Sequence, residues 1–484
     1  MVKTKRRKSI PRKTVSSTST KKAKKNQQNS DVGNNFVSGG IEENGPLFAL
    51  AVCGPFLTIL LGYITSQKFY NTGTEPFLST MIPACISDIS SCGSSVLNAG
   101  LSDFPPTMNA VKFICGFMVV AFFLEFLPGQ IETGPETLTG HVPNYVDNGM
   151  LHCLTFSALF WGGSNLGPGK YYDFGIIYDV FPSAIVFLNI FGLLFCVFLT
   201  YKGLHFPSTA DSGSSGSKVK DFLWGTELYP RLGWWDLKRF INCRFSMTFW
   251  QLAGLSFFYK SYTVHNKIDY GLLFSAISQY VYLFKFFLWE MGYMRSIDII
   301  VDRAGFEIQW GCLCFVPAVY TLCTRFCVMR PSGLELPVAS CIFVISLVSI
   351  ALNYASDRER EVFRATNGKT LVWGRKPEII KAEYVSVDPK TGKRSKKKSL
   401  LLASGFWGQA RHLQYLFELM AAWSWCFLAN PFVNGVIPMF YAFFLTYLLI
   451  DRANRDSKKC HLKYGKYYEE YVRRVPYKII PGIY

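Results

Sequence analysis

Two arginines stand close together in a strongly charged internal stretch of the sequence. Residues 356–364 read SDREREVFR, with Arg360 and Arg364 four positions apart. Residues four apart lie on one face of a helix, so the two guanidinium groups would form a fork suited to a phosphate. The alternative is a solvated helix end in which glutamates pair with the arginines, and the local sequence by itself favours that alternative.

A second stretch combines small, aromatic and basic residues at the mouth of an apolar run. Residues 401–415 read LLASGFWGQARHLQY, so Arg411 and His412 follow the turn around Trp407 directly. Polar and ionisable groups at membrane depth are costly and tend to be functional. The aromatic rings here can stack on a nicotinamide or adenine ring. An interfacial aromatic belt with an arginine reaching toward the headgroups is the alternative.

The C-terminal stretch is dense in tyrosine, lysine and arginine. Residues 451–471 read DRANRDSKKCHLKYGKYYEEY, and the sequence closes with VPYKIIPGIY. These side chains supply donors and ring faces for a dinucleotide, whereas a juxtamembrane helix facing lipid is the alternative. The sequence contains no P-loop, HExxH or GxGxxG motif, and its 14 cysteines show no zinc spacing. Any nucleotide is therefore held without a Rossmann domain, and we expect no metal site.

Apolar runs must position these segments. Of the 484 residues, 50% are hydrophobic and only 17% are charged, where a soluble domain carries about 25%. The pattern predicts an all-α fold, a polytopic membrane bundle of about ten transmembrane helices, whose C-terminal part could hold a dinucleotide. The runs lie at 47–66, 109–128, 150–165, 181–201, 246–264, 270–290, 305–325, 335–354, 411–428 and 432–450.

The positive charge, +18 overall, gathers beside these runs. Basic loops next to apolar spans mark cytoplasmic faces, so ten spans would leave both termini in the cytosol. We expect no nucleic-acid partner, although a nuclear role for the basic N-terminal run is the alternative. Three parts are predicted: a disordered basic cytosolic tail (1–45), a transmembrane bundle (46–354), and a C-terminal region with two further spans and a basic tail (355–484).

Taken together, the sequence from about residue 105 to 484 resembles the sterol C=C reductase family. The long LLxSGxWGxxRH and DRxxRDxxxCxxKYG blocks carry the resemblance. Within the family it is most similar to members that reduce the C7–C8 double bond of Δ5,7-sterols. The stretches that favour those members are DSG at 211–213, WGTELYPR at 224–231, NCRF at 242–245, DRAGF at 302–306, TNGK at 366–369 and VWGR at 372–375.

The resemblance implies a cofactor, NADPH, and a set of site residues. Arg360 and Arg364 would grip its 2′-phosphate, and Tyr282, linked to Asp456 directly or through a network, would be the proton donor. Glu290 and His412 are further residues of interest. The remaining cofactor contacts would be Leu402, Trp407, Gln414, Tyr415, Asp456, Cys460, His461, Leu462, Lys463, Tyr464 and Tyr471. Phe406 and Gln414 depart from the family, where many members have Trp and Asn.

The resemblance also implies a sterol pocket in the 46–354 bundle and a C-terminal NADPH-binding part, the cofactor-binding region 355–484. It implies a setting as well: a multi-pass protein of the endoplasmic reticulum membrane that takes its sterol sideways from the bilayer. Membrane lipid and other sterol-pathway enzymes are the expected partners. Reduction of a Δ14 or side-chain double bond, a non-catalytic sterol-binding scaffold and an isoprenylcysteine-type methyltransferase are the alternatives. The sequence leaves open whether Cys85 and Cys92 form a disulfide.

Overall fold

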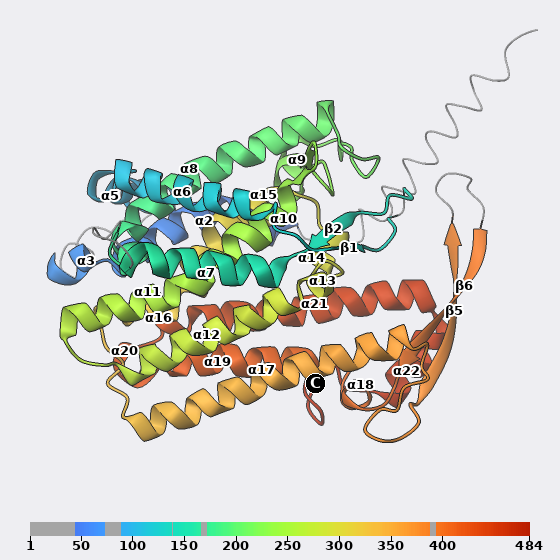
Figure 1. Ribbon diagram of the computed structural model, residues 1–484. Coiled ribbons are helices and arrows are strands. Elements are labelled where there is room, and N and C mark those ends of the chain that lie inside the picture. The colour runs from blue at the N-terminus through green and yellow to red at the C-terminus, as the bar shows by residue number, and fades with distance from the viewer. Residues whose placement is uncertain (1–43, 73–88, 138, 166–171, 388–393) are drawn as a thin grey trace, which may run out of the picture. The chain divides into compact units, whose positions relative to one another are not determined.

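Long apolar runs satisfy their backbone hydrogen bonds inside a membrane most simply as helices. The computed structural model is accordingly mostly helical (Figure 1). Residues Ala49–Tyr484 form one compact unit, and of the other unit, Met1–Phe48, only the start of one helix is described. Nearly all of residues 1–45, which are predicted to be disordered, lie outside the described residues. The side chains of Cys85 and Cys92 also lie outside them. The described ranges are 44–72, 89–137, 139–165, 172–387 and 394–484.

The helices follow one another with short connections. Their bounds are α2 (Asn44–Ile64), α3 (Gln67–Thr72), α5 (Ile89–Asp103), α6 (Met108–Leu124), α7 (Gly149–Asn165), α8 (Ile176–His205), α9 (Lys218–Trp224), α10 (Leu237–Arg239), η2 (Phe240–Met247), α11 (Thr248–His265), α12 (Tyr270–Leu288), α13 (Glu290–Tyr293), α14 (Ile297–Ile300), α15 (Phe306–Trp310), η3 (Gly311–Tyr320), α16 (Leu322–Phe326), α17 (Leu336–Ala365), α18 (Phe406–Gln409), α19 (Leu413–Phe427), α20 (Pro431–Asn434), η4 (Ile437–Met439), α21 (Phe440–Tyr464) and α22 (Lys466–Arg474). Here η2 and η3 are π-helices and η4 is a 3₁₀-helix.

Helical structure occupies every predicted span, but two spans are broken. The 305–325 run divides into α15, η3 and α16, with Pro317 inside the π-helix. Proline lacks the N–H that continues an α-helix and its ring clashes with the preceding turn, so a wider helix replaces the regular one. The 432–450 run becomes a regular helix only at Phe440, because Gly435 adopts a φ of 69° in the connection before it.

Three of the described helices are long and apolar enough to cross a membrane: α8, α12 and α17. A fourth is reached if the segments Gly93–Asp103 and Met108–Leu124, bent by 94°, count as one span. The apolar helix Phe48–Ile64 is shorter. The protein is therefore a membrane protein by its apolar helices, while the full count of ten spans stays a prediction.

One side of α8 carries large apolar side chains that the protein itself does not cover. Leu194 is 65% exposed, and Ile190, Val197 and Phe198 are exposed beside it. A contiguous exposed apolar surface of this kind marks contact with another apolar phase. We interpret this side of α8 as facing lipid.

Three antiparallel strand pairs depart from the all-α prediction. Two are short: β1 (Gln130–Thr133) with β2 (Asn144–Asp147), and β3 (Arg231–Leu232) with β4 (Trp235–Asp236). The third pairs β5 (Ile379–Val387) with β6 (Arg394–Leu402). Its first strand reads IIKAEYVSV, rich in β-branched residues, which favour a pleated and half-buried surface.

The β5–β6 hairpin separates two small apolar clusters near the C-terminus. Ile380 packs with Tyr468 and Tyr471 of α22. On the other side Ile379, Leu402 and Trp407 share a cluster. Figure 1 shows the hairpin beside α22 and close to the end of α17. The hairpin thus fixes α18 and α22 next to the charged end of α17.

Four helices form the frame of the C-terminal part: α12, α17, α19 and α21. Helix α17 packs against α12 and α19, and α19 packs against α21. The 30-residue α17 also runs without a break through the boundary predicted at residues 354 and 355. The division into a bundle and a cofactor-binding region stays a prediction.

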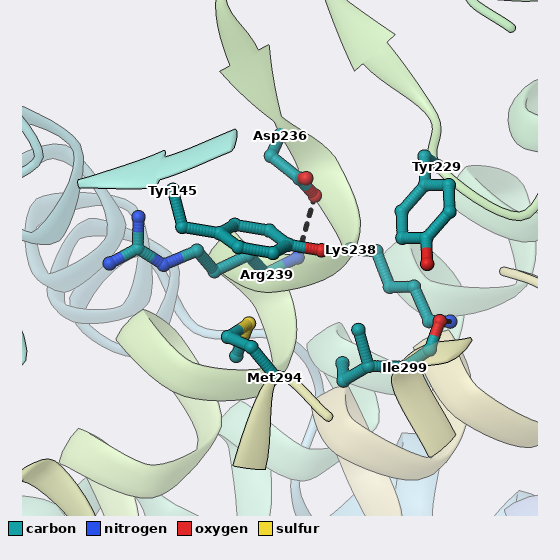
Figure 2. A pocket seen from close by; sticks show the side chains of 7 residues that line it. All are labelled: Tyr145, Tyr229, Asp236, Lys238, Arg239, Met294 and Ile299. Carbon is teal, nitrogen blue, oxygen red and sulfur yellow. Dashed lines mark hydrogen bonds between the residues drawn. The ribbon is translucent and has the colours of Figure 1, made fainter. Parts of the chain in front are cut away.

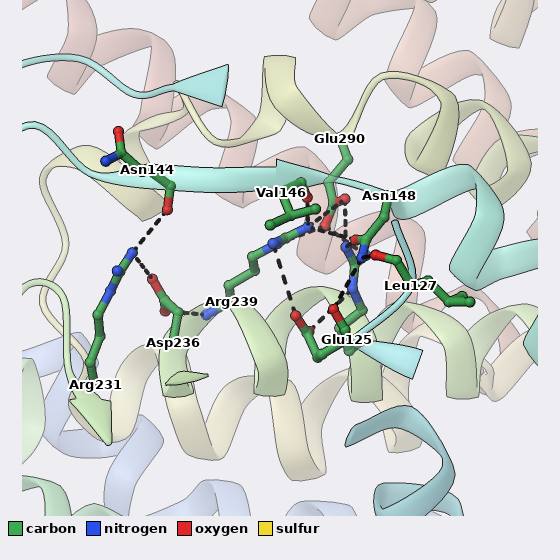
Figure 3. Close-up of polar contacts among 10 residues, drawn as sticks. Glu125, Leu127, Asn144, Val146, Asn148, Arg231, Asp236, Arg239 and Glu290 are labelled. Atoms are coloured by element: carbon green, nitrogen blue, oxygen red, sulfur yellow. Dashed lines mark hydrogen bonds and ion pairs between the residues drawn. The ribbon is translucent and has the colours of Figure 1, made fainter. Parts of the chain in front are cut away.

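A buried ion network ties the elements on the N-terminal side together (Figure 3). Glu290 of α13 is paired with Arg244 of η2 at 2.7 Å and with Arg239 of α10 at 3.2 Å. Glu125, which ends α6, lies 3.2 Å from Arg244. Asn148 accepts a hydrogen bond of 2.8 Å from Arg244 through Oδ1. Two carboxylates and two guanidinium groups leave this network neutral, so Glu290 has a structural role here.

The lipid-facing assignment of α8 predicts that Leu194→Arg impairs membrane insertion. An arginine at the centre of a spanning helix costs about 2.5 to 3.5 kcal/mol on insertion scales. Val219→Arg is the control, because Val219 is similarly exposed but lies in the short α9. Membrane-fraction yield and size-exclusion profiles of fluorescent fusions measure the effect. Equal behaviour of the two variants would contradict the assignment.

The ion network predicts that Glu290→Gln destabilises the fold. Removing one partner leaves buried arginines without their counter-charge, which costs about 3 to 5 kcal/mol. Glu132→Gln is the matched control, since its pair with Arg295, at 3.9 Å, is exposed and such pairs contribute about 0 to 1 kcal/mol. Thermal unfolding in detergent compares the two. A melting temperature for Glu290→Gln that equals that of Glu132→Gln would refute the structural role.

Candidate active site

The predicted proton donor lies within the four-helix frame. Tyr282 is on α12, and its hydroxyl donates a hydrogen bond of 2.5 Å to Glu418 Oε1 on α19. Its ring packs against Trp250 and Trp425, with centroids 5.7 Å and 5.2 Å away. The direct partner of Tyr282 is therefore Glu418 and not Asp456. Sequence reasoning missed Glu418, although it is the single charged residue of α19.

Polar side chains continue from Tyr282 toward α17. Lys285, one turn further along α12, holds its Nζ 5.2 Å from the centroid of the Tyr282 ring. That amine donates a 2.5 Å hydrogen bond to Asn353 Oδ1, and Asn353 donates to the backbone carbonyl of Gln414 at 3.0 Å. These contacts join α12, α17 and α19 around the tyrosine.

The predicted phosphate-binding arginines lie at the far end of α17, where one of them covers an indole ring. Arg360 places its guanidinium carbon 3.9 Å from the ring centroid of Trp407, and it pairs with Asp357 at 3.4 Å. The Trp407 carbonyl accepts a 3.1 Å hydrogen bond from Tyr471. Burial raises the pKa of Tyr471 above its usual value, so that hydroxyl remains a donor. Arg364, one turn further along α17, is exposed.

Helix α21 brings the C-terminal residues to the same place. Asp456 lies 3.7 Å from Nε2 of His412 and accepts a hydrogen bond of 3.6 Å from the thiol of Cys460. The ring of His412 stacks on Tyr415, with centroids 5.1 Å apart. The charge of Arg364 interacts with Asp456, Cys460 and Tyr464 of α21. The arginines and the C-terminal block, distant in sequence, therefore converge.

Some predicted contact residues do not face this convergence. Leu462 is 86% exposed, and His461 is exposed beside it, 3.8 Å from Glu469. Lys463 holds its Nζ 4.4 Å from the ring centroid of Tyr384 on β5. Leu402 is buried in the cluster beneath Trp407, a packing position. Phe406, one of the two departures from the family, packs edge-on against Trp373 and Phe417.

Buried polar atoms without partners occur at the convergence, as they do elsewhere in the described structure. Oε1 of Gln414, Nδ1 of His412 and Nε of Arg411 are buried and have no hydrogen-bond partner among the described residues. Such atoms are costly to leave unpaired. Together with the exposed guanidinium of Arg364 they offer donors and an acceptor for a polar, anionic molecule. The residues present therefore fit a phosphorylated dinucleotide such as NADPH.

A small pocket elsewhere belongs to a different part of the protein (Figure 2). It leaves no enclosed space even for a water molecule, whereas ligand pockets enclose roughly 300 to 1,000 Å³. Lys238 in its wall donates to the carbonyls of Ile299 and Asp302, at 3.0 Å and 2.5 Å. Burial lowers the pKa of Lys238 to about 8. No predicted site residue lines this pocket; its lining is Tyr145, Tyr229, Asp236, Lys238, Arg239, Met294 and Ile299.

Comparison with known proteins agrees with the sequence resemblance. The chain is 42% identical to the 7-dehydrocholesterol reductase of Arabidopsis thaliana over 385 residues, which covers 78% of this chain and 86% of the relative. It is 32% identical to the Xenopus laevis protein of the same name, covering 78% and 81%. It is 31% identical to the Delta(14)-sterol reductase of Methylotuvimicrobium alcaliphilum, covering 78% and 84%.

A family model extends the match over nearly the whole described chain. The model is that of the Ergosterol biosynthesis ERG4/ERG24 family, and it matches residues 44–484. The match includes all four frame helices and both of the blocks that converge at the end of α17. The protein belongs to this family of sterol reductases, and its relatives indicate that it is an oxidoreductase.

Proposed function

We propose that this protein reduces a ring double bond of a sterol with NADPH, and that the bond is C7–C8 of a Δ5,7-sterol. One arrangement carries the proposal. Five helices converge at Arg360, close to the Tyr282–Glu418 pair: α17, α18, α19, α21 and α22. The relatives named 7-dehydrocholesterol reductase support the choice of bond.

The proposed cofactor residues divide the work between charge and ring contacts. Arg360 and Arg364 bind the 2′-phosphate as a fork on one face of α17. Gln414 and His412 offer the buried atoms that lack protein partners. Trp407, held by Tyr471 and beneath the guanidinium of Arg360, orients that arginine. When bound, NADPH supplies a hydride.

Tyr282 supplies the other half of the reduction. A sterol double bond carries no electron-withdrawing group, so it does not accept hydride until a proton has been added to it. The acid must therefore lie beside the alkene in a site from which water is excluded. The Tyr282 ring packs against Trp250 and Trp425, so one side of the donor is apolar. A flat, apolar substrate would reach it sideways from the bilayer.

We further propose that the protein resides in the endoplasmic reticulum membrane with both termini in the cytosol. The charged end of α17 and the basic α21–α22 segment would then face the cytosolic NADPH pool. Membrane lipid surrounds the apolar side of α8, and other sterol-pathway enzymes are proposed partners.

Reduction of a Δ14 double bond is the second candidate. The Delta(14)-sterol reductase relative, matched over 78% of this chain, favours it. The same frame and the same arginines would serve that reaction, since only the position of the sterol relative to Tyr282 differs.

Expression in yeast, which accumulates Δ5,7-sterols, tests the proposed reaction. We expect the diene ultraviolet absorbance to fall and a sterol two mass units heavier, saturated at C7, to appear in mass spectra. Yeast that expresses Tyr282→Phe at the same level should keep the sterol profile of yeast without the protein. An unchanged profile with well-folded wild-type protein would refute C7–C8 reduction, and rescue of a strain lacking Δ14 reductase would then test the second candidate.

The phosphate-binding role predicts a change in cofactor preference. A charge-assisted hydrogen bond contributes about 1.5 to 3 kcal/mol, so Arg360→Ala and Arg364→Ala should each lower kcat/KM for NADPH by about tenfold to a hundredfold. The value for NADH, which lacks the phosphate, should change little. Arg358→Ala is the control, since Arg358 is exposed on α17 and pairs with Glu361. Equal losses with both cofactors would contradict the assignment.

A further inference from the structure

Glu418 is a carboxyl group that the proposed mechanism does not yet use. It lies in α19, a helix whose other residues are mostly apolar and aromatic. An ionisable side chain at such a place is costly and is rarely kept without a function. Its Oε1 accepts a hydrogen bond from the Tyr282 hydroxyl at 2.5 Å. The carboxyl therefore touches the group that is proposed to protonate the sterol.

Charged groups from the neighbouring helices surround this carboxyl. Its charge interacts with Lys285 of α12, Asp357 of α17 and Arg452 of α21. Arg452 is itself paired with Asp298. Three tyrosine hydroxyls also face Glu418 among the described residues: those of Tyr282, of Tyr320 in η3 and of Tyr441 in α21.

These groups form a line that leaves the apolar frame. Lys285 donates to Asn353 on α17. Asp357 is one turn further along α17, interacts with Lys285 and pairs with Arg360 at 3.4 Å. Polar and ionisable side chains therefore continue from Tyr282 to the end of α17, where the cofactor phosphate is proposed to bind. No comparable contact joins Tyr282 to Asp456 among the described residues.

We propose that Glu418 is the residue that returns a proton to Tyr282 in each turnover. The inference rests on the proposed function. The O–H bond of Tyr282 breaks as a C–H bond forms on the alkene, and the hydride completes the reduction. The O–H bond of protonated Glu418 then breaks and restores the phenol. The carboxylate left on Glu418 takes its next proton from cytosolic water along the line of Lys285 and Asp357.

The same arrangement sets the direction of the donor before reaction. While Glu418 is ionised it accepts the hydroxyl hydrogen of Tyr282, which is the contact that the structure shows. Once Glu418 carries a proton it can donate to the Tyr282 oxygen, and the phenolic hydrogen is free to point at the substrate. Protonated Glu418 thus returns a proton to Tyr282 and orients the Tyr282 hydroxyl hydrogen toward the substrate.

The test compares Glu418→Gln and Glu418→Asp in purified, full-length protein with NADPH and the Δ5,7-sterol. General acid–base groups contribute about 10² to 10⁴-fold, so kcat of Glu418→Gln should fall by about a hundredfold or more, with the sterol KM within about threefold. Wild-type kcat should decline as pH rises, and Glu418→Gln should lose that dependence. Glu418→Asp, which keeps a carboxyl, should recover at least about tenfold over Glu418→Gln.

Glu335→Gln is the matched control, because Glu335 is an exposed carboxyl at the start of α17, and it should keep wild-type kinetics. Wild-type kcat and pH dependence in Glu418→Gln would overturn the inference while leaving the proposed function intact. Wild-type protein that reduces no sterol would overturn the proposed function itself. If Glu418→Gln does not fold, the kinetics of Glu418→Asp test the inference instead. A pH-dependent kcat within about tenfold of wild type supports it. A larger loss of kcat without pH dependence contradicts it.

Discussion

A charge inside an apolar helical frame must find an opposite charge or a hydrogen bond, and this constraint organises the whole protein. Arg239 and Arg244 are neutralised by Glu125 and Glu290, which joins α6, α10, η2 and α13. Near the proposed reaction centre, Glu418 is bound by Tyr282 and lies within the field of Lys285. The first set of charges holds the fold together, and the second is placed for chemistry.

Helix α17 connects the two ends of the proposed reaction. Its apolar part packs on α12 and α19, where Asn353 contacts Lys285. Its last turns carry Asp357, Arg360 and Arg364 out to Trp407 and to α21. Because one continuous helix carries all of these groups, the proton side and the cofactor side of the site are held at a fixed spacing.

Local sequence predicted what depends on local spacing. Apolar runs located helical structure in every expected span, and the four-residue interval predicted that Arg360 and Arg364 share a face. The β5–β6 hairpin was missed because lysines dominate its second strand and hide the alternation. Glu418 was missed because its partner, Tyr282, is 136 residues away in the sequence. A contact between α12 and α19 is set by helix packing, which no spacing along the chain reveals.

In the proposed reaction one hydrogen comes from the cofactor as hydride and the other comes from the protein as a proton. Turnover by the purified protein with NADPH deuterated at the transferred position in ordinary water, and then with unlabelled NADPH in heavy water, tests it directly by mass spectrometry. We expect one deuterium in the product sterol from each experiment, on the two adjacent carbons of the former double bond. Two deuteriums from one source, or none from either, would contradict it.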